Sequence, residues 1–94
     1  MKKPYLPFTQ RVIDTIKEIP AGQVMTYGDV ARVAGSPRGA RQVVRILHTL
    51  SEAENLPWHR VVNKDHEITA PGMTGEIQKQ LLADEGVFLP LKRI

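Results

Sequence analysis

The sequence predicts a mainly α-helical domain with a small β wing, which is a winged helix-turn-helix fold. Three observations lead to this prediction. Apolar residues recur at helical spacing in several segments, a glycine separates a short helical segment from one with a basic face, and two short β-prone segments flank a polar turn. The 94 residues allow one domain, residues 1–94, which would bury roughly 60–65% of its unfolded surface.

The first two helices are predicted from periodicity and capping residues. Helix 7–19 carries apolar residues at helical spacing: Phe8, Val12, Ile16 and Ile19. The Pro-Ala-Gly segment at 20–22 ends this helix. A second, short helix is expected to begin at Thr26, because threonine caps helices and Asp29 occupies the capping-box position. Gly35 then stops it, since glycine readily closes a helix.

A third helix is predicted to open at Ser36-Pro37, with Ser36 as N-cap and Pro37 as the first helical residue. One face is apolar and is formed by Val43, Ile46, Leu47 and Leu50. The opposite face is basic and carries Arg38, Arg41, Arg45 and His48. This pattern fits the recognition helix of a helix-turn-helix. It fits equally well an ordinary amphipathic helix whose arginines face water.

The second half of the chain predicts a hairpin and a last helix. Residues 60–62 and 67–69 are β-prone and flank the turn-like segment 63–66, so we expect them to pair as the wing. After a loop at 70–73, Thr74 is expected to cap a helix that contains Ile77, Leu81 and Leu82. Gly86 stops this helix, and an apolar tail with a basic end follows.

Composition restricts the possible functions. The chain has no cysteine, so disulfides, thiolate metal sites and cysteine nucleophiles are excluded. The net charge of +3 at pH 7 makes nucleic acid a plausible partner. Three histidines far apart in sequence give little support for a metal site, and we expect neither metal nor cofactor. No signal peptide or membrane span is evident, so we expect an intracellular protein, cytoplasmic and nucleoid-associated in a bacterium. We also expect a monomer.

Several segments match, in order, a known family. The run from Ile19 to Gly28, followed by Ala31 and by residues 40–43, resembles the helix-turn-helix of the O6-alkylguanine-DNA alkyltransferases. The run Pro57-Trp58-His59-Arg60-Val61 resembles their active-site motif, Pro-Cys-His-Arg-Val. Leu81-Leu82 and Glu85-Gly86-Val87 match the family's closing segment. The resemblance covers nearly the whole chain and implies the family's C-terminal, DNA-binding domain.

The chain departs from the family at the residue that accepts the alkyl group, because Trp58 replaces the cysteine. In this it resembles the alkyltransferase-like proteins. That resemblance implies a non-enzymatic protein that binds O6-alkylguanine in duplex DNA and flips the damaged nucleotide out. It also implies that the protein flags the site for nucleotide excision repair proteins.

The resemblance also implies roles for individual residues. A lesion pocket is expected from Tyr27, Trp58, Val61, Pro71 and Gly72. DNA contacts are expected from Thr26, Tyr27, Arg38, Gly39, Ala40, Arg41 and Arg45. Arg41 matches the arginine that replaces the flipped nucleotide, and Gly39 and Ala40 are small enough to approach the groove. His59, Arg60 and Glu85 are expected to support the pocket. The family's asparagine after the recognition helix falls at Leu50.

Other interpretations of these residues remain open. Trp58 can be a core residue, Arg41 a solvated or phosphate-binding arginine, and Tyr27 a half-buried residue at a helix start. A winged-helix regulator or architectural DNA-binding protein without lesion preference is the alternative function. A residual hydrolase that uses His59 and Glu85 ranks last, because no nucleophile or metal cluster accompanies them.

Overall fold

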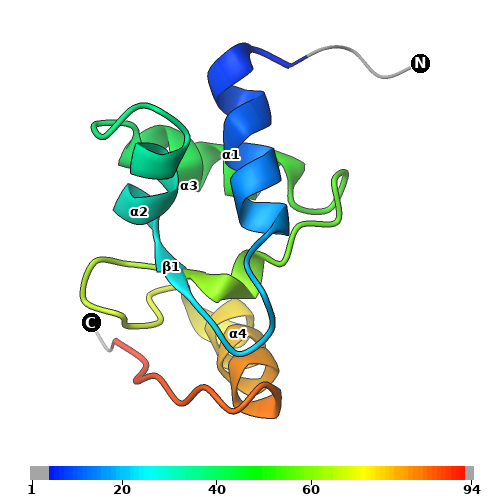
Figure 1. Ribbon diagram of the computed structural model, residues 1–94. Helices are drawn as coiled ribbons and strands as arrows, with labels where there is room; N and C mark the ends of the chain where they lie inside the picture. Colours follow the sequence, from blue (N-terminus) through cyan, green and yellow to red (C-terminus); the bar gives the residue numbers. More distant parts are fainter. Residues whose placement is uncertain (1–4, 93–94) are drawn as a thin grey trace.

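The computed structural model describes residues 5–92, which form four α-helices, one 3-10 helix and a two-stranded sheet (Figure 1). In chain order the elements are α1 (Pro7–Lys17), β1 (Met25–Thr26), α2 (Tyr27–Val33), α3 (Ala40–Leu50), η1 (Trp58–Arg60), β2 (Val61–Val62) and α4 (Gly72–Asp84). The prediction of a mainly helical fold with little β structure is therefore confirmed. No helix in residues 5–92 is long and apolar enough to cross a membrane.

The core lies where the first three helices meet, with α2 in contact with both α1 and α3. Each helix contributes apolar side chains at helical spacing, and Leu56 and Val61 close the cluster from the second half of the chain. The buried helical residues are Val12, Ile13, Ile16, Val30, Ala31, Val43 and Ile46. The apolar face predicted for α3 thus packs inward, with Leu47 and Leu50 partly buried at its edge.

The helix boundaries agree with the sequence where glycine or a capping box sets them. Thr26 and Asp29 form the predicted capping box, in which Thr26 Oγ1 accepts from the Asp29 amide at 3.0 Å. Gly35 and Gly86 have positive φ and stand two residues after the ends of α2 and α4. Helix α1 ends two residues earlier than predicted, at Lys17, and Ile19 is buried beyond it.

The predicted start of the third helix is wrong. Ser36 and Pro37 lie in a turn that the Gly39 amide closes on the Ser36 carbonyl at 2.8 Å, and α3 begins at Ala40 with Gly39 as N-cap. The turn is favoured here because Gly39 packs beneath Phe8: a Cβ on Gly39 would lie 2.8 Å from Phe8 Cζ. Arg38 therefore precedes the helix instead of lying on it.

The predicted antiparallel wing is also wrong. β2 pairs in parallel with β1, with Met25 opposite Val61 and Thr26 opposite Val62. Residues 67–69 do not return along β2; instead Ile68 forms a parallel bridge with Leu91. The Asn63 side chain directs this path, because its Oδ1 accepts from the amides of Asp65 and Glu67 and folds the loop on itself.

The last helix begins before its predicted cap. α4 starts at Gly72, Pro71 is the N-cap, and no side chain caps this end. Thr74 is therefore a residue of the first turn, and part of the predicted loop 70–73 is helical. Gly75 explains the tight packing of this turn, since a Cβ there would clash with the Ala70 carbonyl. The tail pairs with Ile68, whose amide donates to the Pro90 carbonyl at 2.9 Å and whose carbonyl accepts from the Lys92 amide at 2.8 Å. Residues 93–94 of the predicted tail lie outside the described residues.

Candidate nucleic-acid interface

Trp58 is the first residue of η1, the short 3-10 turn between the loop after α3 and strand β2. Its amide donates to the Leu56 carbonyl at 2.8 Å. Its half-buried indole stands edge-on to His59, with ring centroids 6.3 Å apart. Helix α4 holds the turn from the other side, because Gln78 Nε2 donates to the carbonyls of His59 and Val61, each at 3.2 Å. The backbone around Trp58 is thus fixed from both sides.

Glu85 is the centre of the polar network around η1. Its Oε2 lies 2.9 Å from His59 Nε2 and accepts from Arg60 Nη2 at 2.7 Å. Its Oε1 accepts from Arg60 Nε at 3.0 Å and from the Gly22 amide at 3.0 Å. Arg60 Nη1 continues to the Ile19 carbonyl at 2.9 Å. The network therefore ties η1, the 19–22 loop and the end of α4 together.

The same contacts set the electrostatics of this network. Hydrogen bonds from Arg60, then from His59, hold the pKa of Glu85 far below its usual range, against a smaller opposing effect of burial. The hydrogen bond to Glu85 in turn raises the pKa of Arg60. Glu85 is therefore a carboxylate at neutral pH and Arg60 a cation. The structure brings together all three residues predicted to support the pocket.

Gln78, Ile19 and Gly22 are partners in this network that sequence patterns did not predict. Gln78 is 5% exposed on α4, where its amide satisfies two carbonyls of a distant segment. The only sequence feature that indicated this role of Gln78 was its position four residues before Leu82, on the row of α4 that faces inward. Gly22 and Ile19 contribute only main-chain atoms, which no side-chain pattern reveals.

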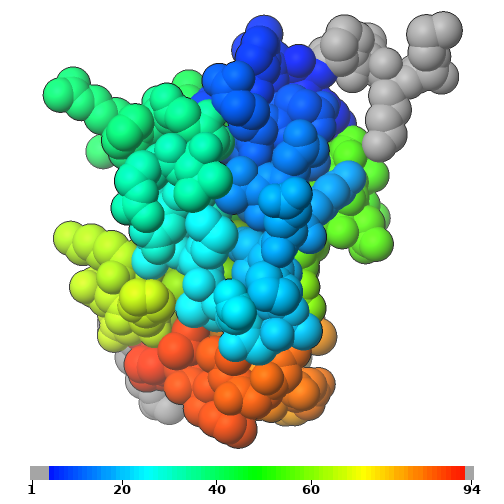
Figure 2. Space-filling model, viewed as in Figure 1, coloured from blue at the N-terminus to red at the C-terminus, as the bar shows by residue number. Residues whose placement is uncertain are grey.

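The basic face of α3 is exposed. Arg41, Arg45 and His48 follow at positions i, i+4 and i+7 and so share one side of the helix. Arg38 is exposed in the turn that precedes α3, and Lys64 is exposed in the loop after β2. This turn and this loop project from the same side of the molecule (Figure 2). Positive charge is thus available over a surface that extends beyond the helix.

Gly39 and Ala40, predicted to approach the groove, are both shielded by the protein. Gly39 is buried, and the position of its absent side chain is filled by Phe8 and the Ser36 carbonyl. Packing against α1 is therefore a sufficient reason for glycine at this position. Ala40 is partly buried at the first position of α3. Arg41, by contrast, is exposed one residue further along.

Tyr27 and Trp58 are each near one of the two paired strands in sequence: Tyr27 directly follows β1, and Trp58 shortly precedes β2. Thr26 pairs with Val62, Tyr27 follows as the first residue of α2, and Trp58 stands three residues before Val61. Tyr27 is half-buried, and this burial raises the pKa of its hydroxyl. Thr26 has its hydroxyl engaged in the capping box. Val61, the third predicted pocket residue, is 1% exposed and belongs to the core.

Pro71 and Gly72 lie at the start of α4, where they line an open cleft of about 570 Å³. The other residues around this cleft are Thr69, Ala70, Glu76, Leu91 and Lys92. Tyr27, Trp58 and Val61 do not line it. The structure therefore does not place all five residues predicted for the lesion pocket around this cleft.

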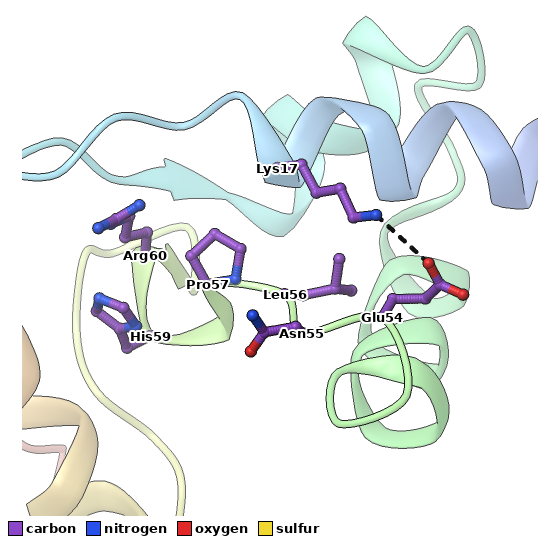
Figure 3. Close-up of a pocket in the computed structure, with 7 residues that line it drawn as sticks. All are labelled: Lys17, Glu54, Asn55, Leu56, Pro57, His59 and Arg60. Atoms are coloured by element: carbon purple, nitrogen blue, oxygen red, sulfur yellow. Dashed lines mark hydrogen bonds and ion pairs between the residues drawn. The ribbon is translucent and has the colours of Figure 1, made fainter.

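A second cleft, also of about 570 Å³, lies on the α1 side of η1 (Figure 3). His59 and Arg60 stand at one end and Lys17 and Glu54 at the other (Figure 3), with Lys17 Nζ 3.4 Å from Glu54 Oε1. Tyr5 also donates to Glu54, at 2.7 Å. Trp58 does not line this cleft, so its indole and the neighbouring His59–Arg60 pair have different surroundings.

A small, mainly helical domain with an exposed basic helix after a tight turn has the features of a DNA-binding domain. Residues 7–87 match the family model of the 6-O-methylguanine DNA methyltransferase, DNA binding domain. The chain belongs to this family.

Two curated relatives are most informative. The chain is 51% identical over 82 residues to the DNA base-flipping protein of Escherichia coli K12, which covers 87% of the chain and 64% of the relative. It is 40% identical over 82 residues to alkyltransferase-like protein 1 of Schizosaccharomyces pombe, covering 85% and 76%. The chain thus spans less than two thirds of the length of its E. coli relative.

Solved structures that are similar to this chain come from the same two kinds of protein, alkyltransferase-like proteins and methyltransferases. The S. pombe Atl1 complex with damaged DNA containing O6-carboxymethylguanine superposes with a TM-score of 0.74 at 40% identity, covering 84% of this chain and 75% of that one. The Mycobacterium tuberculosis O6-methylguanine methyltransferase superposes with a TM-score of 0.70 at 27% identity, covering 87% and 50%. The fold is therefore similar both to a methyltransferase and to an alkyltransferase-like protein.

Proposed function

We propose that this protein recognises O6-alkylguanine in duplex DNA without removing the alkyl group, and that it flags the lesion for nucleotide excision repair. One observation carries the proposal. An indole stands between Pro57 and His59, where alkyltransferases hold their thiol, while the network of His59, Arg60 and Glu85 that braces this position is complete. A site that keeps its supporting hydrogen bonds but lacks the nucleophile favours binding of the lesion over transfer of its alkyl group.

Alkyl transfer requires a polarisable nucleophile that attacks the alkyl carbon. The chain contains no cysteine, and the indole of Trp58 offers an N–H that can only donate. Glu85 is committed to Arg60 and the Gly22 amide, and its lowered pKa makes it a poor proton acceptor. The His59–Glu85 pair is therefore a structural brace in this proposal, and the lesion keeps its alkyl group.

Recognition depends on taking the damaged nucleotide out of the helix, which costs a few kcal/mol of stacking and pairing. Stacking of the extruded base on Trp58 returns about 1–3 kcal/mol. The exposed Arg41 fills the gap in the duplex, where a guanidinium can stack and donate to the orphaned base. Tyr27 contacts the flipped nucleotide or its phosphate from the start of α2. The name of the E. coli relative and the damaged DNA in the Atl1 complex support this mechanism.

The exposed cations fix the protein on the duplex. Arg38, Arg45 and Lys64 are available for phosphates, so binding weakens as salt rises. By family resemblance α3 docks at the minor groove. Pro71 and Gly72 border an open cleft and carry no large polar side chain, which favours tolerance of bulky O6 adducts. Affinities for duplexes with O6-methyl, O6-benzyl and O6-carboxymethyl guanine test this tolerance, and a strong preference for methyl contradicts it.

The decisive experiment compares matched duplexes with guanine or O6-methylguanine. Wild type should bind the lesion duplex more tightly. Trp58→Ala should lower affinity for the lesion by roughly 5- to 150-fold, the equivalent of about 1–3 kcal/mol of stacking. Trp58→Phe is the matched control that retains an aromatic face. Arg41→Ala should also reduce the preference, because the gap in the duplex is then left unfilled.

Two outcomes contradict the proposal. Equal affinity of the wild type for both duplexes indicates a winged-helix regulator or architectural protein. Loss of the alkyl group from DNA recovered after prolonged incubation, measured by mass spectrometry of its nucleosides, indicates an enzyme. We expect the lesion to be recovered intact at all times.

A further inference from the structure

Helix α4 has a buried row of residues and a second, exposed row that is apolar. One row packs inward and consists of Gly75, Gln78 and Leu82. A second row at positions i, i+4 and i+8 is exposed: Met73 at 73%, Ile77 at 46% and Leu81 at 36%. Isolated apolar residues are ordinary on protein surfaces, whereas a continuous row along one helix is the pattern of an interaction surface. We call Met73, Ile77 and Leu81 the α4 apolar row.

An acidic row runs along one side of the α4 apolar row. Glu76, Gln80 and Asp84 each follow a member of the apolar row by three positions, so they are its neighbours on the helix surface. All three are exposed, and Gln80 donates to Asp84 at 2.9 Å. Within residues 5–92, neither Glu76 nor Asp84 forms an ion pair. We call these three residues the α4 acidic row, in which Glu76 and Asp84 carry the negative charge and Gln80 is neutral.

Charge limits what can cover this surface. DNA is disfavoured because the acidic row would repel its phosphates. A second copy is also disfavoured, because two α4 helices packed antiparallel along the apolar row bring acidic row against acidic row. Lys79 follows Glu76 by three positions, but it lies on the side of Glu76 away from Ile77 and forms no ion pair with Glu76 within residues 5–92. The surface instead fits an apolar ridge bordered by lysine or arginine.

We propose that the α4 apolar row and the α4 acidic row form the docking surface for a basic amphipathic helix of a partner protein. The apolar side chains of that helix cover Met73, Ile77 and Leu81, and its lysines or arginines face Glu76 and Asp84. In Figure 1, α4 lies at the opposite end of the molecule from α2 and α3, so DNA on α3 leaves it accessible. This proposal rests on α4 alone and does not require lesion recognition.

The probe is a labelled synthetic helical peptide with leucines along one row and lysines beside it. Its twin has the same leucines and glutamates in place of the lysines. The lysine peptide should bind the full chain about fivefold more tightly than its twin at low salt, which corresponds to two exposed charge pairs. The difference should shrink as salt screens these pairs. Amide chemical shifts should move along α4 and not along α3.

Three variants test the assignment. Glu76→Lys combined with Asp84→Lys should reverse the preference between the two peptides. Ile77→Ser should weaken binding of both, and Lys79→Ala should leave both unchanged. Circular dichroism establishes that each variant is folded, and the unchanged affinity of Ile77→Ser and Lys79→Ala for lesion DNA separates docking from recognition. Equal binding of the two peptides, shifts centred outside α4, or self-association through α4 in sedimentation equilibrium each overturns the proposal.

Discussion

Replacing Glu85 with glutamine should destabilise the protein by about 2–3 kcal/mol. The carboxylate accepts hydrogen bonds from Arg60 and the Gly22 amide and pairs with His59, and its side chain is 16% exposed. Glutamine keeps one acceptor oxygen but loses the charge, which leaves Arg60 without a counterion at 18% exposure. The upper end of the range for a broken buried pair does not apply, because water still reaches both groups.

Urea unfolding at pH 7, followed by circular dichroism, measures this loss directly. For a domain of this size the variant should melt roughly 8–24 °C below the wild type. Glu76→Gln is the matched control, since Glu76 is an exposed glutamate on α4, and it should change stability by less than about 0.5 kcal/mol. A loss below about 0.5 kcal/mol in Glu85→Gln would refute the idea that this network holds η1.

The pH dependence gives a second check with a definite sign. The pKa of Glu85 is lowered in the folded state, so its stabilising contribution is fully present above the unfolded value near 4.5 and is lost as pH falls below it. The difference between wild type and Glu85→Gln should shrink as pH falls below about 4.5. A difference that grows on acidification would contradict the lowered pKa.

Three further predictions concern the DNA-binding half. Gly39→Ala should cost about 1–3 kcal/mol of stability in thermal unfolding, because its Cβ would lie 2.8 Å from Phe8 Cζ, and shortening Phe8 to leucine should recover part of the loss. Thr26→Ala should cost about 1 kcal/mol in urea unfolding through loss of the capping box. Arg45→Ala should weaken binding to damaged and undamaged DNA alike and reduce the slope of log K against log salt by about one. No recovery with leucine, no loss at Thr26, or a lesion-specific effect at Arg45 would contradict the respective predictions.

The parts of the fold that the sequence predicts correctly are those set by local chemistry. The apolar face of α3 and the Thr26–Asp29 capping box each depend on residues close in the chain. The errors arise where distant contacts decide. Ser36-Pro37 is a plausible helix start, but packing of Gly39 against Phe8 moves the start to Ala40. The β-prone segment around Ile68 bridges to Leu91 and not to its neighbour β2.

The site divides in the same way. The triplet His59, Arg60 and Glu85 could be named from a motif, and the structure brings these residues together. The main chain of Gly22 could not, because main-chain atoms carry no pattern in the sequence, and the only signal for Gln78 was a polar residue on the inward row of α4. The pocket expected from Trp58 and Pro71 stays a prediction. Trp58 belongs to η1 and does not line the cleft that Pro71 borders at the start of α4.

Trp58 is the only tryptophan in the chain, so fluorescence excited at wavelengths where tyrosine does not absorb reports on it alone. The most direct test of the central claim titrates the protein with duplexes that contain guanine or O6-methylguanine and follows this emission to saturation. Stacking of the extruded base on the indole predicts stronger quenching at saturation, and tighter binding, with the lesion duplex. The same emission at saturation and the same affinity for both duplexes would contradict the claim that Trp58 receives the damaged base.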